Sequence, residues 1–334
     1  MALPCVEEIV VEDLNPKIQR QIERLQHSSY QAVEAEIAQK RIAWFQQRNQ
    51  IVAGSDRPTP RQAFDLLFFD YMGLSPDELP IVSETDTEII WQSTNPCPTL
   101  EAVKALGLDT RTVCRATTEK STQGFVSQLD PQLRFLRSYE EIRPHAAYCR
   151  EMIVRVDFAA MMRLALEEAE LSRQKGNKGY GAVIALGQRI LSRAHNTTGA
   201  MSDLGLGDSK SMLKATLRDN PPFLPLDCHA QRAGANADQQ ELHAELNAIR
   251  QAVQVLGDSN LSGAILFSTR EPCPMCSSLA VWANLTTIVY GASIEETAHL
   301  DKARIQVSAA DVVAKSPVMI EVIGGVLREE CLAL

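Results

Sequence analysis

Two short segments of this sequence carry metal-binding side chains, and each lies at the start of a predicted helix. His243-Ala244-Glu245 opens one helix, and Pro272-Cys273-Pro274-Met275-Cys276 joins a strand to the next helix, 30 residues further on. One imidazole and two thiolates are three ligands that suit zinc, and a three-ligand site leaves one coordination position open for water, as catalytic zinc sites do. The fold must therefore bring both helix starts together around a catalytic zinc ion, one per chain.

The spacing of the two cysteines suits a single metal ion. Cys273 and Cys276 are three residues apart across a helix start, so both sulfurs can face one metal. Pro274 fits the first helical turn, where its missing N–H has no partner in any case, and the helix N-terminus favours thiolates electrostatically. We therefore expect His243, Cys273 and Cys276 to be the metal ligands.

Glu245 is the expected catalytic residue. It follows His243 by two residues, at a helix start where the backbone still changes direction, so its carboxylate can reach a metal-bound water without binding the metal. Zinc lowers the pKa of such a water towards about 7, and one carboxylate can accept its proton and return it to a ring nitrogen and then to a leaving amine. The predicted reaction is hydrolytic deamination of an amidine-like carbon, with release of ammonia.

A closed structural zinc site, or four unrelated residues, is the alternative to this interpretation. A closed site needs a fourth ligand, and Cys228 with His229 could supply one or could form a second metal site. A closed site gives no role to Glu245, so the open catalytic site is favoured.

From residue 157 onward, predicted strands and helices alternate, which is typical of a sheet covered by helices. Residues 199–240 interrupt the pattern with many Gly, Asp, Asn and Pro, and are too long for a simple connection, so we interpret them as a functional loop or a small subdomain. The expected helices are 158–173, 241–255, 274–285 and 295–304, and the expected strands are 181–186, 189–194, 264–268, 287–290 and 318–323.

The preceding part of the chain is less regular and indicates a mixed α+β domain. Residues 16–53 are predicted to form one long helix, because apolar residues recur at spacings near three to four. The predicted division is an α+β domain of unassigned role over residues 1–155 and a zinc-dependent deaminase domain over 156–334, with the insertion 199–240. Further expected elements are helices 61–72 and 100–106 and strands 86–91, 133–136 and 152–156.

Length and composition indicate a folded protein of about two domains. The 334 residues are 45% hydrophobic and 22% charged, with a net charge of −9 that disfavours tight phosphate-driven binding of nucleic acid. There is no run of about 18 apolar residues, the N-terminus is acidic where a signal peptide would be basic, and the cysteines are too sparse for a disulfide framework. We expect a cytoplasmic protein with reduced thiols and no membrane partner.

The H-x-E and P-C-x-x-C segments resemble the zinc-dependent cytidine deaminase-like superfamily, and the resemblance covers residues 157–334. Within it, the chain is most similar to the nucleobase and tRNA adenosine deaminase branch. The resemblance implies a three-layer α/β/α cytidine deaminase-like sandwich, beside the separate N-terminal α+β domain, and a homo-oligomer. The supporting stretches are 162–169, 181–184, 194–196, 271–276 and 324–331.

The same resemblance implies substrate-binding residues. In that branch, the asparagine after the second strand hydrogen-bonds the base, a role carried over to Asn196, and the backbone around Ala244 and Glu271 lines the same pocket. Two departures leave the substrate open. Gly179-Tyr180 stands where many relatives have Pro-Phe or Pro-Val, and the insertion 199–240 replaces a short loop.

A weaker likeness rests on the segments Asn95-Pro96-Cys97-Pro98, Glu101-Ala102, Gly107-Leu108-Asp109 and Val113-Cys114-Arg115 and on Cys149. With these segments, residues 60–155 resemble domains related to L-2-amino-thiazoline-4-carboxylic acid hydrolases, and no catalytic residue is carried over from that resemblance. Cys97, Cys114 and Cys149 in this part could form a second metal or thiol site. Free cysteines are commonly buried small hydrophobes, and that is the interpretation favoured here.

Together these observations predict a zinc-dependent hydrolase that deaminates a nucleobase, a nucleoside or a related small nitrogen heterocycle. A tRNA adenosine deaminase is the alternative within enzymes, and it predicts a basic patch beside the zinc pocket. A non-catalytic module, in which zinc stabilises a nucleotide- or protein-binding fold, is the alternative of another class. Small substrates are preferred because the charge balance supplies no evident phosphate-binding face.

Overall fold

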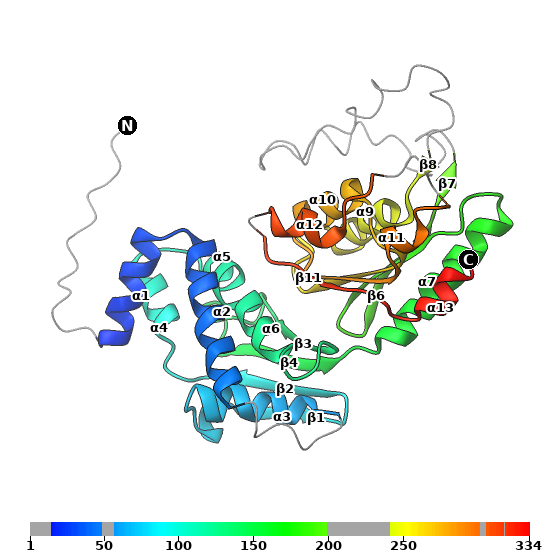
Figure 1. Ribbon diagram of the computed structural model, residues 1–334. Coiled ribbons are helices and arrows are strands. Elements are labelled where there is room, and N and C mark those ends of the chain that lie inside the picture. Colours follow the sequence, from blue (N-terminus) through cyan, green and yellow to red (C-terminus); the bar gives the residue numbers. More distant parts are fainter. Residues whose placement is uncertain (1–14, 49–56, 199–240, 301–304, 317) are drawn as a thin grey trace, which may run out of the picture.

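The strands of the chain form two main sheets, a four-stranded one from the first part and a five-stranded one from the second (Figure 1). The last strand of the four-stranded sheet ends at Arg155, and the first helix that packs on the five-stranded sheet begins at Phe158. The predicted domain boundary, between residues 155 and 156, lies between these two elements. That the two parts fold independently stays a prediction. The computed structural model describes residues 15–48, 57–198, 241–300, 305–316 and 318–334.

The five-stranded sheet has the strand order β11-β10-β9-β5-β6. Strands β9, β10 and β11 are parallel, whereas β5 pairs antiparallel with both β9 and β6. Parallel neighbours require crossover connections, and a helix joins β9 to β10. The strands are β5 (Gly181–Leu186), β6 (Arg189–His195), β9 (Ala264–Arg270), β10 (Thr287–Ala292) and β11 (Glu321–Ile323).

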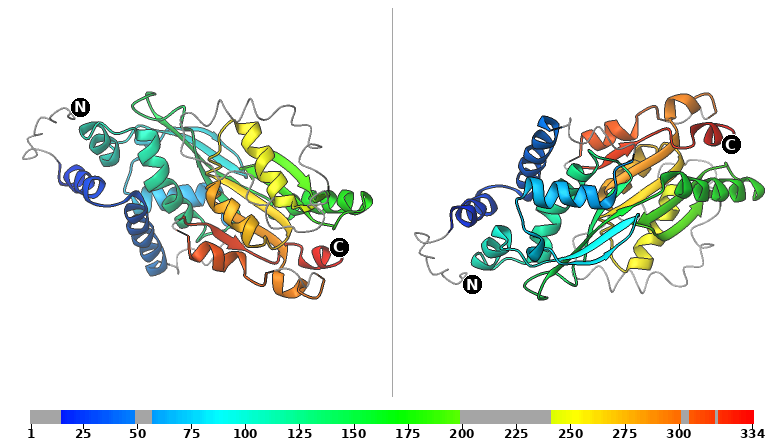
Figure 2. Two further views of the ribbon diagram at one scale, coloured as in Figure 1. Left: turned by 90° about the horizontal axis from the view of Figure 1, so that it is seen from above. Right: turned by 90° about the horizontal axis from the view of Figure 1, so that it is seen from below.

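Helices cover both faces of this sheet (Figures 1 and 2). Ala182 and Ile184 of β5 share an apolar cluster with Ala248 of α9 and Ala280 of α10, while Val183 between them packs in another cluster with α7. Because successive strand residues point to opposite faces, this confirms the expected three-layer α/β/α sandwich. The helices are α7 (Phe158–Gln174), α9 (Ala244–Leu256), α10 (Pro274–Trp282), α11 (Ile294–Thr297), α12 (Ala309–Ala314) and α13 (Arg328–Leu332).

The four-stranded sheet is antiparallel, with the order β1-β2-β4-β3. An aromatic core packs against it, in which the rings of Phe64 and Trp91 are 4.8 Å apart. Its strands are β1 (Ile81–Glu84), β2 (Glu88–Ser93), β3 (Leu133–Arg137) and β4 (Cys149–Arg155), and its helices are α1 (Pro16–His27), α2 (Tyr30–Gln47), α3 (Pro60–Phe64) with a π-helical continuation Asp65–Tyr71, α4 (Pro98–Ala105), α5 (Thr110–Cys114) with a π-helical continuation Arg115–Glu119, and α6 (Lys120–Val126).

The prediction of one long helix over residues 16–53 is wrong. Helix α1 ends at His27, and Ser29 caps α2 by accepting a hydrogen bond from the Ala32 N–H. A serine side chain competes with the helical backbone for its hydrogen bonds, which favours a break at this position. The apolar periodicity continues across the break and hides it.

Several other elements differ from expectation. The segment 110–126 is helical although no helix was predicted there, and α12, α13 and β1 were also missed. The predicted helix 241–255 begins only at Ala244, because residues 241–242 form the short strand β8 (Glu241–Leu242), which pairs with β7 (Thr197–Thr198). The predicted helix 295–304 extends in the described chain only over α11, and residues 301–304 lie outside the described residues.

The two parts of the chain are in direct contact. Val154 of β4 belongs to the same apolar cluster as Val183 of β5, and the Arg134 guanidinium pairs with the Glu321 carboxylate at 2.9 Å. Within the described ranges, no helix has the length and apolar character needed to cross a membrane.

Candidate active site

The two predicted helix starts meet on one face of the five-stranded sheet. His243 is the last residue before α9, and Cys273 is the last before α10, which opens with Pro274 as expected. Helices α9 and α10 pack against each other on that face (Figure 1). Strand β9 ends at Arg270, so the buried strand delivers the segment Glu271-Pro272-Cys273 to this point.

The side chains of His243, Cys273 and Cys276 converge. One ligand atom of each lies within 4.8 Å of the others, and the His243 Nδ1 atom is 3.6 Å from the Cys273 sulfur and 3.5 Å from the Cys276 sulfur. Both cysteines are buried and the histidine is half-buried. Hydrogen bonding from Cys276 is the main cause that lowers the pKa of the Cys273 thiol to about 3.

This donor set fits zinc. Three soft or borderline ligands surround one point, and among the residues that the structure describes no other group of three His, Cys, Asp or Glu side chains is arranged in this way. Thiolates are the metal-binding form of cysteine, and the lowered pKa of Cys273 favours that form.

Glu245 lies next to this cluster without belonging to it. Its side chain is 3% exposed. The Ser268 hydroxyl donates a hydrogen bond to its Oε1 atom at 3.2 Å, and the Cys276 sulfur lies 3.7 Å from its Oε2 atom. The carboxylate is therefore held beside the predicted metal position. Sequence reasoning missed Ser268, whose only signal was its place on a strand that runs into the cysteine segment.

Asn196 and Ala244 are also brought to this site. Both are fully buried, and the Asn196 Oδ1 atom accepts a hydrogen bond from the Ala244 N–H at 2.8 Å. The first N–H groups of a helix have no partner within the helix, so Asn196 satisfies one of them at the start of α9. The contact fixes Asn196 next to His243, while its binding of a base stays a prediction.

The Glu271 side chain makes backbone contacts of a different kind. Its two carboxylate oxygens accept hydrogen bonds from the Ile294 N–H and the Ala309 N–H, each at 2.8 Å. It thereby ties the first residues of α11 and α12 to the end of β9. Carboxylates at helix N-termini are stabilised by the unpaired N–H groups there. The predicted pocket-lining role concerned the backbone at this position and stays a prediction.

The residues on either side of the insertion lie next to each other, because β7 and β8 pair. Asn247 of α9 reinforces this region by donating a hydrogen bond to the His195 carbonyl at 3.0 Å. Cys228, His229 and the insertion 199–240 itself lie outside the described residues.

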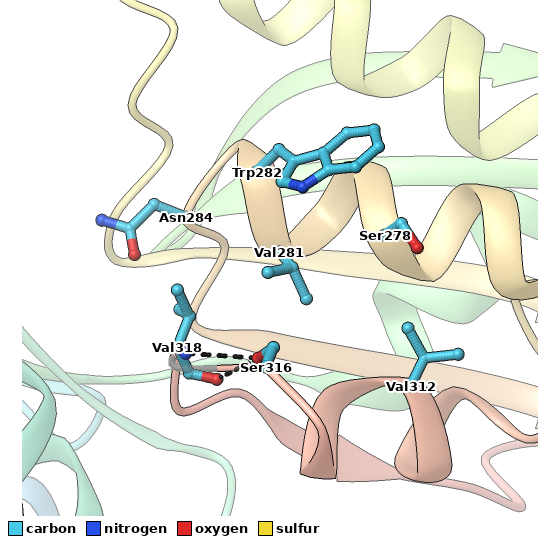
Figure 3. A pocket seen from close by; sticks show the side chains of 7 residues that line it. All are labelled: Ser278, Val281, Trp282, Asn284, Val312, Ser316 and Val318. Carbon is cyan, nitrogen blue, oxygen red and sulfur yellow. Dashed lines mark hydrogen bonds between the residues drawn. The ribbon is translucent and has the colours of Figure 1, made fainter. Parts of the chain in front are cut away.

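The three cysteines considered as a second metal or thiol site are Cys97, Cys114 and Cys149. They are free, and among the described residues they do not form a metal-binding group of the kind described above. A pocket of about 510 Å³ lies along α10 and α12, lined by residues that include Trp282 and Val312 (Figure 3). None of its lining residues is a predicted site residue.

Comparisons with known proteins identify a family model and several relatives that match part of the chain. Residues 156–292 match the family model of the cytidine and deoxycytidylate deaminase zinc-binding region. The tRNA-specific adenosine deaminase of Bacillus subtilis (strain 168) is 29% identical over 177 residues, which are 51% of this chain and 81% of that protein. The guanine deaminase of Bacillus subtilis (strain 168) is 43% identical over 57 residues, which are 17% of this chain and only 36% of that protein.

Solved structures also match part of the chain. One from a study of A-to-I editing by tRNA:A34 deaminases has 24% sequence identity and covers 52% of this chain and 97% of its own, with a TM-score of 0.35.

Proposed function

We propose a reaction for this chain from the match of residues 156–292 to the family model of the cytidine and deoxycytidylate deaminase zinc-binding region. The proposed activity is hydrolytic deamination of a nucleobase, a nucleoside or a related small nitrogen heterocycle, with release of ammonia. The observation that carries it is the placement of a buried carboxylate, Glu245, beside a cluster of one imidazole and two sulfurs.

Each residue of the site has a distinct role in this proposal. His243, Cys273 and Cys276 would hold the zinc ion, which when bound supplies Lewis-acid activation of water near neutral pH. Glu245 would take a proton from the attacking water, hold it at a carboxylate oxygen, and deliver it to the ring nitrogen of the substrate and then to the leaving amine. The hydrogen bond from Ser268 to Oε1 orients that carboxylate.

A tRNA adenosine deaminase is the second candidate. Its support is the similarity to the tRNA-specific adenosine deaminase of Bacillus subtilis. Against it, the net charge of −9 lacks the excess of Lys and Arg that phosphate-driven RNA binding uses. Small heterocycles are therefore the first substrates to test.

The test is a screen for ammonia release by the purified, zinc-loaded full chain. The substrates are free guanine, adenine and cytosine, their nucleosides, related heterocycles, and a tRNA anticodon stem-loop. Glu245→Gln is the matched variant, because it keeps the shape of the side chain and loses the ability to accept a proton. General acid–base catalysis contributes about 10²–10⁴-fold, so the variant should lose at least about a hundredfold of the rate and keep its zinc.

The outcomes separate the candidates. Turnover of the stem-loop alone would favour the tRNA candidate over small heterocycles. Full activity in Glu245→Gln would refute the assigned proton transfer. No ammonia from any substrate, together with unfolding when zinc is removed, would favour the non-catalytic module in which zinc stabilises a binding fold.

A further inference from the structure

A second cavity, of about 480 Å³, lies where the N-terminal helices meet the segments around α10. One wall comes from α2, the helical segment 110–126 and Tyr139, and the other from Asn260, Asn284 and Val318. None of the residues predicted for the active site lines it. Cavities of this size hold small molecules in other proteins, and meeting points between structural units are common places for them.

The two walls are joined by a short chain of hydrogen bonds. The Lys120 ammonium donates to the Asn284 Oδ1 atom at 2.8 Å, and the Asn284 Nδ2 atom donates to the Asn260 Oδ1 atom at 3.0 Å. Asn284 follows α10 in the left-handed backbone conformation, with φ 57°, which asparagine tolerates better than most residues. Three lining residues, Lys120, Asn284 and Asn260, are therefore held in place by hydrogen bonds.

Two lining residues carry buried polar atoms that the fold does not use. Glu34 is 6% exposed, and in the described chain its Oε1 atom has no hydrogen-bond partner. The same holds for the Nε atom of Arg115, whose guanidinium lies 4.3 Å from the centre of the Tyr139 ring. A buried donor or acceptor without a partner destabilises the fold. A ligand with a donor for Glu34 and an acceptor for Arg115 would supply the missing hydrogen bonds.

The charges of the lining favour a singly charged acid. Arg111, Arg115 and Lys120 contribute three cationic groups. Burial is the main cause that raises the pKa of the Glu34 carboxyl to about 7, so this group opposes an anion only partly at neutral pH. Asp258 lies 3.8 Å from Arg115 and would repel a doubly charged phosphate more than a carboxylate.

We propose that this cavity binds a small aromatic carboxylic acid that also carries a hydrogen-bond donor. The guanidinium of Arg115 and the ammonium of Lys120 would bind the carboxylate, Glu34 would accept from the donor, and Tyr30 and Tyr139, which also line the cavity, would contact an aromatic body. This site is separate from the zinc-binding cluster and does not depend on the proposed deaminase activity.

Calorimetric titration of the zinc-loaded full chain tests the proposal with matched probes. The first probe is 4-hydroxybenzoate, which has both the carboxylate and the donor. Benzoate lacks the donor, 4-hydroxybenzamide lacks the charge, and inorganic phosphate offers a different anion. One 4-hydroxybenzoate should bind per chain, and each of the other three probes should bind about 10-fold more weakly or worse, as expected for the loss of one charged or buried hydrogen bond.

Variants and a mapping experiment locate the site. Arg115→Gln should weaken 4-hydroxybenzoate binding about 10-fold or more, whereas Arg173→Gln, at an exposed arginine of α7, should leave it unchanged. Hydrogen exchange of the wild-type chain should show protection by the probe at residues 30–34 and 111–120, and this reading does not require the variant to fold.

Absence of 4-hydroxybenzoate binding, or protection confined to other segments, would overturn the proposal. Equal affinity for 4-hydroxybenzamide would overturn the charged part of the recognition. Binding of phosphate as tight as that of 4-hydroxybenzoate would overturn the assignment to a carboxylic acid.

Discussion

The two sheets of this chain are embedded in interiors that use polar groups differently. Beside the five-stranded sheet, Asn196, Glu245 and Ser268 are buried close to the predicted metal ligands. Beside the four-stranded sheet, buried polar side chains link structural elements instead. There the Glu151 carboxylate binds Arg137 and the Trp91 indole N–H. Similar burial thus serves the candidate chemistry in one part and the scaffold in the other.

The largest expected effect is a loss of stability when the hydrogen-bond network around Glu151, beside the four-stranded sheet, is broken. Glu151 is 4% exposed, and it accepts hydrogen bonds from the Arg137 guanidinium at 2.8 Å and from the Ser93 hydroxyl at 2.6 Å. Glu151→Ala would leave Arg137 buried without its counter-ion, which costs about 3–5 kcal/mol. Urea unfolding should show this loss in the free energy of unfolding.

A surface ion pair supplies the matched control. Glu141→Ala removes the partner of Arg150, whose side chain is 29% exposed, and should cost no more than about 1 kcal/mol. Equal losses of unfolding free energy in Glu151→Ala and Glu141→Ala would mean that the buried network around Glu151 stabilises the fold no more than a surface ion pair does. The zinc content of folded Glu151→Ala protein should equal that of wild type, because none of the predicted ligands contacts Glu151.

The same contrast explains what the sequence could predict. In the second part, apolar runs such as residues 181–186 and 264–268 mark buried strands, and the observed β5 and β9 cover them. The cysteine and histidine spacing predicted that side chains distant in sequence would meet, and His243, Cys273 and Cys276 do converge. A metal site requires particular residue types at particular spacings, and such a pattern can be recognised in the sequence.

The first part of the chain has no such pattern where its interior is polar, so the elements there could not be predicted. Residues 119–123 are Glu, Lys, Ser, Thr and Gln, yet all five are buried. Arg41 of α2 donates hydrogen bonds to Ser121 at 3.1 Å and to Thr122 at 2.6 Å, so this helical segment is held by a side chain that is 80 residues from Ser121 in sequence. A hydrophobic pattern cannot reveal a helix whose buried face is polar. The contact from Ser268 to Glu245 was missed for a related reason, since pairing between a strand and a helix is set by the fold.

An intermediate effect is expected from Glu34, through the pH dependence of stability. Burial raises the pKa of its carboxyl from 4.5 to about 7 in the folded chain, so between these values the folded state binds more protons than the unfolded state. The stability contributed by this group is therefore present at low pH and is lost as the pH rises through about 7. Glu34→Gln cannot titrate, so it does not lose stability in this way as the pH rises. The free energy of unfolding of the variant minus that of wild type should therefore be about 2 kcal/mol larger at pH 8 than at pH 5.

Urea unfolding of both proteins at the two pH values measures this difference. Glu170→Gln, at an exposed acid of α7, is the control and should keep a constant difference from wild type. A difference for Glu34→Gln that does not change with pH would contradict the effect of burial on this carboxyl.

The smallest effect is expected at Ser268, and it tests whether buried polar groups near the zinc-binding cluster serve chemistry. Its hydroxyl donates to Glu245 at 3.2 Å and does not belong to the ligand cluster. Ser268→Ala should lower kcat about 10-fold or more, because one hydrogen bond to a charged group contributes about 1.5–3 kcal/mol, with KM and zinc content unchanged. Ser268→Thr keeps the hydroxyl and should restore most of the rate.

Ser278 provides the comparison that isolates this orienting role. It lies on α10 and donates to the Pro274 carbonyl at 2.7 Å, so Ser278→Ala removes a half-buried hydroxyl near the cysteines without touching Glu245. If both alanine variants lower kcat equally, the loss at Ser268 reflects local packing and not the carboxylate. If Ser268→Ala alone is slow and Ser268→Thr recovers, the polar groups beside the five-stranded sheet act on the reaction, as those beside the four-stranded sheet do not.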